Sequence, residues 1–227
     1  MTQTLKAVTI EPDTQAQACI IWLHGLGASG HDFVPIVPEL RLAKNHGIRF
    51  IFPHAPSRPV TLNLNMKMPA WYDIYAIELH TQEDHTGIME ATNLIHQLID
   101  QQREQGIEAE NIIVIGFSQG AGLALYSGLH YKHPLAGIGV LSGYLPLAKT
   151  LPAASETPNG QTPILMMHGT EDKTLPLVFG EASLQRLQQQ GYAVDWKIYP
   201  MEHTVSLPQV YELSHWLNTR LKTLIEV

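Results

Sequence analysis

The stretch Asn111-Ile-Ile-Val-Ile-Gly-Phe-Ser-Gln-Gly-Ala-Gly-Leu-Ala-Leu125 joins an apolar, β-branched run to a segment typical of a helix. At its centre, Gly116-Phe-Ser-Gln-Gly120 has the G-x-S-x-G spacing of a sharp turn between a strand and a helix. Such a turn strains the backbone of its serine and closes tightly. The residues two before and two after Ser118 must therefore have almost no side chain. The pattern predicts a strand, a nucleophilic serine and a helix in succession. A packing turn rich in glycine and serine is the alternative interpretation.

Apolar runs like the one before Ser118 recur along the chain and alternate with helical stretches. Because they are apolar on both faces, they predict buried parallel strands. They span residues 19–23, 49–52, 111–115, 137–141, 163–167 and 195–199. A helical spacing of apolar residues marks one stripe within 83–105 and another from Val210 to Leu224.

This order of strands and helices predicts a doubly wound, mostly parallel α/β sheet with helices on both faces. Residues 5–10 are expected to add an antiparallel edge hairpin. We expect one domain spanning residues 1–227, with ligands bound at the carboxyl ends of the strands.

Composition excludes several classes of function. The 14 Lys and Arg against 21 Asp and Glu give a net charge of −7, which argues against a nucleic-acid partner. Cys19 is the one cysteine, so no internal disulfide forms, and the start of the chain lacks a secretory signal; the cytoplasm is the expected compartment. No apolar run reaches the roughly 20 residues of a membrane span. The 12 histidines show no metal-binding spacing, so we expect neither a metal nor a cofactor.

A serine hydroxyl needs a base to take its proton and an acid to orient that base. After a nucleophile turn of this kind, the acid and then the histidine follow along the chain. Asp172 and His203 each come just after a predicted strand and satisfy this order, with Glu171 as the nearest competitor for the acid. His168 is interpreted instead as a strand-end histidine bonded to local backbone.

Acyl transfer also needs two donors directed at the developing oxyanion. We expect the backbone amides of Gln119, directly after the serine, and of Leu26, in the glycine-rich loop 22–30. A plain tight turn is the alternative for that loop.

Residues 53–73 do not fit the alternation of strands and helices. The segment is rich in Pro, Asn and Met and has no lasting period, so we expect a functional loop that covers the active site. Its apolar side chains, Leu64, Met66, Met68 and Trp71, are predicted to contact the acyl chain of a substrate. Packing of these four side chains against the core is the alternative.

These motifs together resemble the carboxylesterase/phospholipase family of α/β hydrolases, which includes acyl-protein thioesterases and lysophospholipases. The matching segments are residues 24–27, 52–56, 58–63, 68–73, 116–120, 141–146 and 168–172, with His203. The resemblance implies the α/β-hydrolase fold, the triad of Ser118, Asp172 and His203, and oxyanion amides at Leu26 and Gln119. It also implies that Tyr144 and Leu175 lie beside an acyl groove.

Three positions depart from the family pattern: Ala28, Ala121 and Glu202. The two alanines are small. Glu202 lies next to the expected base, where it either affects the pKa of His203 or points to solvent.

The expected function is hydrolysis of acyl esters or thioesters of short to medium chain length through an acyl-serine intermediate. Small acyl esters, lysophospholipids and acylated proteins remain open as substrates, and a homodimer is left open. The alternatives are a catalytically silent hydrolase fold that acts as a binding module and a peptidase of the same fold. The peptidase is disfavoured because 227 residues leave no room for a propeller or cap domain.

Overall fold

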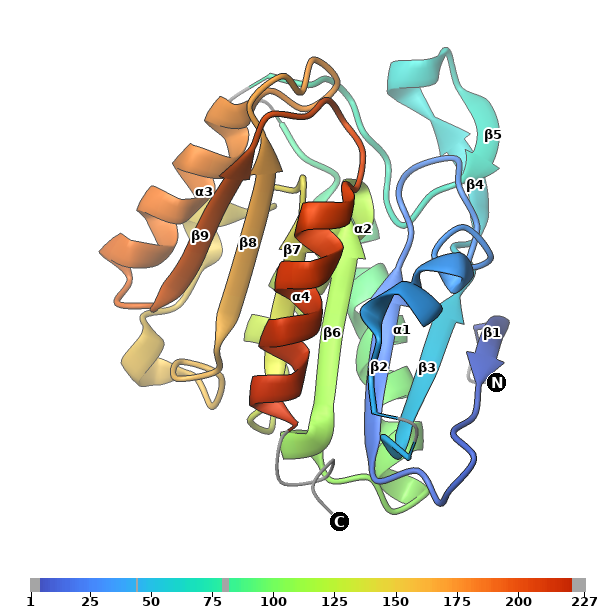
Figure 1. Ribbon diagram of the computed structural model, residues 1–227. Coiled ribbons are helices and arrows are strands. Elements are labelled where there is room, and N and C mark those ends of the chain that lie inside the picture. Colours follow the sequence, from blue (N-terminus) through green and yellow to red (C-terminus); the bar gives the residue numbers. More distant parts are fainter. Residues whose placement is uncertain (1–4, 44, 79–81, 222–227) are drawn as a thin grey trace.

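The computed structural model describes residues 5–43, 45–78 and 82–221 and is built on a seven-stranded sheet. The strand order is β1-β3-β2-β6-β7-β8-β9 (Figure 1). The strands are β1 (Ala7–Ile10), β2 (Ala18–Leu23), β3 (Ile48–Pro53), β6 (Ile112–Phe117), β7 (Gly137–Leu141), β8 (Ile164–Gly169) and β9 (Val194–Tyr199). All neighbours pair in parallel except β1, which runs antiparallel to β3. The mostly parallel α/β sheet expected from the sequence is confirmed.

The central strands form because their side chains are buried on both faces of the sheet. In β2, Cys19, Ile21 and Leu23 face one apolar cluster, whereas Ile20 and Trp22 face another. This alternation follows from the two-residue period of a strand, and it explains why the parallel strands are continuous apolar runs.

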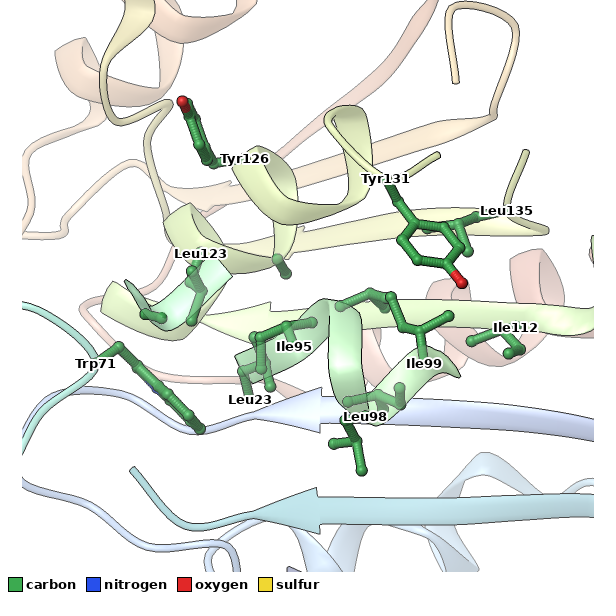
Figure 2. Close-up of a cluster of buried hydrophobic side chains, with 14 of the residues drawn as sticks. Leu23, Trp71, Ile95, Leu98, Ile99, Ile112, Leu123, Tyr126, Tyr131 and Leu135 are labelled. Atoms are coloured by element: carbon green, nitrogen blue, oxygen red, sulfur yellow. The ribbon is translucent and has the colours of Figure 1, made fainter. Parts of the chain in front are cut away.

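Helices cover both faces of the sheet. One face of the sheet carries α1 (His85–Glu104), α2 (Gln119–Leu129) and α3 (Leu177–Gln189). The other face carries α4 (Leu207–Arg220) and two short 3-10 helices, Val34–Ile36 and Pro38–Leu40. The predicted stripe of α1 is buried, and Figure 2 shows its Ile95, Leu98 and Ile99 within the first cluster.

Two expectations for the N-terminal third are wrong in detail. The early strand, β1, lies at the sheet edge but pairs with β3, so it forms no hairpin with the strand that follows it. Residues 53–73 are not an irregular loop, because β4 (Ser57–Val60) and β5 (Met66–Pro69) form an antiparallel hairpin around a 3-10 turn, Thr61–Asn63. This hairpin stands beyond the carboxyl end of β3 (Figure 1). Leu224 lies outside the described residues.

Within the part of the chain that the structure describes, no helix combines the length and the apolar character needed to cross a membrane.

Asp84 caps the long helix α1 by accepting a hydrogen bond from Gly87 N at 2.9 Å. Asp84→Ala should therefore lower the free energy of unfolding by about 1–2 kcal/mol in urea titrations. Glu90→Ala is the matched control, since Glu90 is an exposed carboxylate in the same helix, and its change should stay within about 0.5 kcal/mol. Equal losses in the two variants would contradict a capping role.

Candidate active site

Ser118 lies between the end of β6 and the start of α2 with a strained backbone, φ 55° and ψ −120°. The two flanking glycines make this turn possible. A Cβ on Gly116 would overlap the carbonyl oxygen of Gly120, and a Cβ on Gly120 would lie 2.5 Å from the carbonyl oxygens of Leu23 and His24. The G-x-S-x-G spacing therefore reflects steric exclusion at both positions.

Ser118, His203 and Asp172 form a continuous hydrogen-bonded chain from three separate loops. His203 Nε2 lies 2.9 Å from Ser118 Oγ, and His203 Nδ1 lies 2.6 Å from Asp172 Oδ2. Because a carboxylate can only accept, Nδ1 carries the proton and donates it to Asp172. Nε2 is then the acceptor for the serine hydroxyl, which is the arrangement a general base requires.

Asp172 is buried and fully partnered. Its Oδ1 accepts hydrogen bonds from the amides of Thr174 at 3.0 Å and Leu175 at 2.8 Å, which leaves Oδ2 for the histidine. Glu171, the competing acid, is exposed, and its backbone amide bonds to Met201 O. Glu202 is also exposed to solvent.

His168 lies close to the same carboxylate but has a different environment. Its Nε2 donates to Leu175 O at 2.8 Å and is 3.7 Å from Asp172 Oδ2. Burial lowers the pKa of His168 below its ordinary value, so the ring stays neutral at neutral pH. The ring therefore holds local backbone, as the sequence predicted.

The two expected oxyanion donors flank Ser118. A Cβ placed on Gly25 would lie 3.4 Å from Ser118 Cβ, so the loop that carries Leu26 packs directly against the serine. Among the described residues, the amides of Leu26 and Gln119 donate no hydrogen bond, whereas the neighbouring Gly27 N donates to Pro69 O. Both amides thus have no hydrogen-bond partner in the part of the chain that the structure describes.

Ser118 opens into a cavity of about 1010 Å³. Leu26, Tyr144 and Leu175 line it, and the resemblance implied an acyl groove beside the last two of these residues. Further walls come from residues that were not among the predicted contacts to the acyl chain. They are Leu62 and Asn63 at the hairpin, Tyr72–Glu78 after it, Leu145 and Leu147 after β7, and Phe179, Ala182, Ser183 and Arg186 of α3.

The four apolar side chains of the 53–73 segment do not line this cavity in the described part of the chain, so that prediction is wrong. Pairing of β4 with β5 places Leu64 and Met66 toward solvent, 88% and 57% exposed. Met68 Sδ accepts a hydrogen bond from Asn63. Trp71 is fully buried, and Figure 2 shows it beside Leu23 in the core.

A family model described as Phospholipase/Carboxylesterase matches residues 5–221. The chain belongs to this family. It is 39% identical to acyl-protein thioesterase 1 of Neurospora crassa, over 90% of this chain and 87% of that protein. It is 43% identical to acyl-protein thioesterase 1 of Schizosaccharomyces pombe, over 82% and 83%. The crystal structure of Arabidopsis thaliana SOBER1 superimposes with a TM-score of 0.84 at 34% identity, covering 91% of this chain and all of that one.

These findings confirm the family resemblance in the motifs, and membership makes the chain a hydrolase that acts on esters. Within the described residues, no group of three or more His, Cys, Asp or Glu side chains is arranged to hold a metal ion.

In this member of the family, two tyrosines form a polar spot on the cavity wall. The hydroxyls of Tyr72 and Tyr144 are 3.1 Å apart. Burial raises the pKa of Tyr144 to about 12 and raises the pKa of Tyr72 above its ordinary value, so both phenols are protonated at neutral pH. Burial also raises the pKa of the nearby Glu83 carboxyl, which accepts from Leu147 N at 3.0 Å.

The two carboxylates next to each other in sequence should differ sharply in their effect on rate. Asp172→Asn should lower kcat by about 10⁴, because the amide favours the wrong imidazole tautomer. Glu171→Gln should lower it less than tenfold, which is under about 1.4 kcal/mol of barrier. Steady-state kinetics on an activated ester measure both, and the reverse ranking would assign the acid to Glu171.

Proposed function

We propose that this chain hydrolyses acyl esters and thioesters of short to medium chain length, with Ser118 as nucleophile, His203 as base and Asp172 as the acid that orients it. One observation carries the proposal: the hydrogen-bonded chain from Asp172 through His203 ends at Ser118, which lines a mostly apolar cavity. The hydrogen-bonded chain aligns Ser118 as a nucleophile, and the apolar cavity wall offers surface to an acyl chain.

The reaction follows from these contacts in two halves. Ser118 Oγ attacks the acyl carbonyl carbon while His203 Nε2 takes the hydroxyl proton, and the amides of Leu26 and Gln119 stabilise the resulting oxyanion. The tetrahedral intermediate collapses when His203 returns that proton to the departing alcohol or thiol. Water then attacks the acyl-serine, its proton passes through His203 to Ser118 Oγ, and the carboxylic acid leaves.

The nature of the leaving group is the less constrained part of the proposal. A thiol with a pKa near 8.5 departs with little proton donation from His203, whereas an alcohol must be fully protonated by His203 as it leaves. The similarity to proteins named acyl-protein thioesterase favours acylated cysteine as one substrate class. Lysophospholipids and small esters share the same acyl chemistry. A panel of oxyesters, thioesters, lysophospholipids and amides therefore distinguishes these substrate classes.

Ser118→Ala should abolish both turnover and labelling by a fluorophosphonate probe while the fold is retained. Only the hydroxyl is lost, and loss of a triad member costs about 10⁴ to 10⁶ in kcat. Circular dichroism checks the fold, and a labelling gel checks the nucleophile. Full labelling of the variant would point to another serine, and a wild-type chain that neither labels nor turns over any panel substrate would support a binding module.

The cavity should select acyl chains by length. Each methylene buried is worth up to about 0.8 kcal/mol, or about fourfold in kcat/KM, so activity should rise from acetyl to medium-chain esters and level off where the cavity ends. Phe179→Ala should flatten this rise and leave acetyl esters nearly unchanged, because Phe179 lines the cavity. Val178→Ala is the matched control, since Val178 is exposed and lies outside the cavity lining. A series below micelle-forming concentrations tests this, and equal kcat/KM for acetyl and octanoyl esters would contradict it.

A further inference from the structure

Residues 54–71, part of the segment that the sequence marked as unusual, bond repeatedly to the loop that carries Leu26. Pro69 O accepts from Gly27 N at 2.8 Å, and the indole Nε1 of Trp71 donates to His24 O at 2.8 Å. Two further bonds join the same parts of the chain, Ala55 N to His24 Nε2 and Gly30 N to His54 Nδ1, each 3.1 Å. Leu26 therefore lies between two residues whose backbones are held from outside their own loop.

Trp71 and the next residue, Tyr72, bond to the side chain of Gln119, the other proposed oxyanion residue. Gln119 Oε1 accepts from the backbone amide of Trp71 at 3.0 Å, and Gln119 Nε2 donates to Tyr72 O at 2.7 Å. Gln119 is almost fully buried, so solvent does not compete for these bonds. Its side chain thus ties the start of α2 to Trp71 and Tyr72.

We propose that residues 54–72 form a brace that sets the distance between the backbone amides of Leu26 and Gln119, with Trp71 as the positioning residue bonded to both sides. The inference rests on the proposed function, because it assigns those amides to the oxyanion. Trp71 reaches the Leu26 loop through its indole and the Gln119 side chain through its backbone. It lies more than 40 residues from each along the chain.

Oxyanion donors are sensitive to such positioning. They must lie about 2.7–3.1 Å from an oxygen that exists only in the tetrahedral intermediate, and a shift of about 1 Å costs about 10²-fold in rate. The strands β2 and β6 fix where the Leu26 loop and the Ser118 turn begin, but Leu26 and Gln119 both lie beyond the ends of these strands. Bonds from one segment to the Leu26 loop and to the start of α2 restrict the movement of the two amides relative to each other.

Trp71→Phe tests the brace, because it keeps a buried aromatic ring and removes the donor to His24 O. The assay compares an ester with its thiono analogue, in which C=S replaces C=O. Sulfur is a weak hydrogen-bond acceptor and gains less from the two amides. For Trp71→Phe we expect kcat on the oxygen ester to fall about 10-fold to 100-fold with KM little changed, while kcat on the thiono ester falls at most about threefold.

Trp22→Phe is the matched control. Trp22 is also fully buried and is the next-to-last residue of β2, but its indole Nε1 has no hydrogen-bond partner within the described residues. A loss of packing alone affects both variants and both esters alike. The ratio of oxygen-ester to thiono-ester kcat should therefore fall at least about fivefold in Trp71→Phe and stay unchanged in Trp22→Phe.

Parallel falls on the two esters in Trp71→Phe, or no fall at all, would overturn the brace and leave Trp71 as a core residue. If Trp71→Phe does not fold, Gln119→Met removes both side-chain bonds from the opposite side and should lower the same ratio. Failure of the proposed function is distinguishable, because the wild-type enzyme itself would then show no turnover of either ester and no labelling at Ser118.

Discussion

The rest of the site depends on one steric constraint, the closure of the turn at Ser118 against the carbonyl oxygens around it. Gly116 meets Gly120 across the turn, and Gly120 packs on the last residues of β2 and the loop beyond it. The contact brings the serine, the first turn of α2 and the loop that carries Leu26 within a few ångströms of each other. Because β2 and β6 are neighbours in the sheet, the sheet order itself supplies the two loops that must meet.

Three histidines lie near this point, and hydrogen bonding distinguishes their roles. His24 donates from Nδ1 to Gly25 O and accepts at Nε2 from Ala55 N, and His168 donates to Leu175 O. Burial lowers the pKa of both, so each stays neutral and holds backbone. Only His203 has one ring nitrogen on a carboxylate and the other on a hydroxyl. Position at the end of a strand therefore does not distinguish these histidines, whereas the hydrogen-bond partners of their rings do.

Sequence alone predicted the parallel strands, the long helix α1 and the sites of Ser118, Asp172 and His203. The strands were predictable because burial on both faces leaves a continuous apolar run, and the three residues because a fixed chain order follows from the nucleophile turn. The hairpin in 53–73 was not, since its short strands pair across a turn formed by Leu64 and Asn65, both at positive φ. The buried position of the Trp71 side chain was not predictable either. An apolar ring fits a core or a ligand cavity equally well, and only the long-range bond to His24 O distinguishes the two.

Part of the cavity wall comes from segments that do not carry the proposed catalytic groups. Ser118, Asp172 and His203 lie in loops that directly follow strands of the sheet, whereas Leu62, the residues after Tyr72 and Phe179 lie on peripheral segments. Substitutions in those walls can alter cavity shape without moving the reacting atoms. The shape of the cavity can therefore be varied at those walls alone, while the hydrogen bonds that join Asp172, His203 and Ser118 are left as they are.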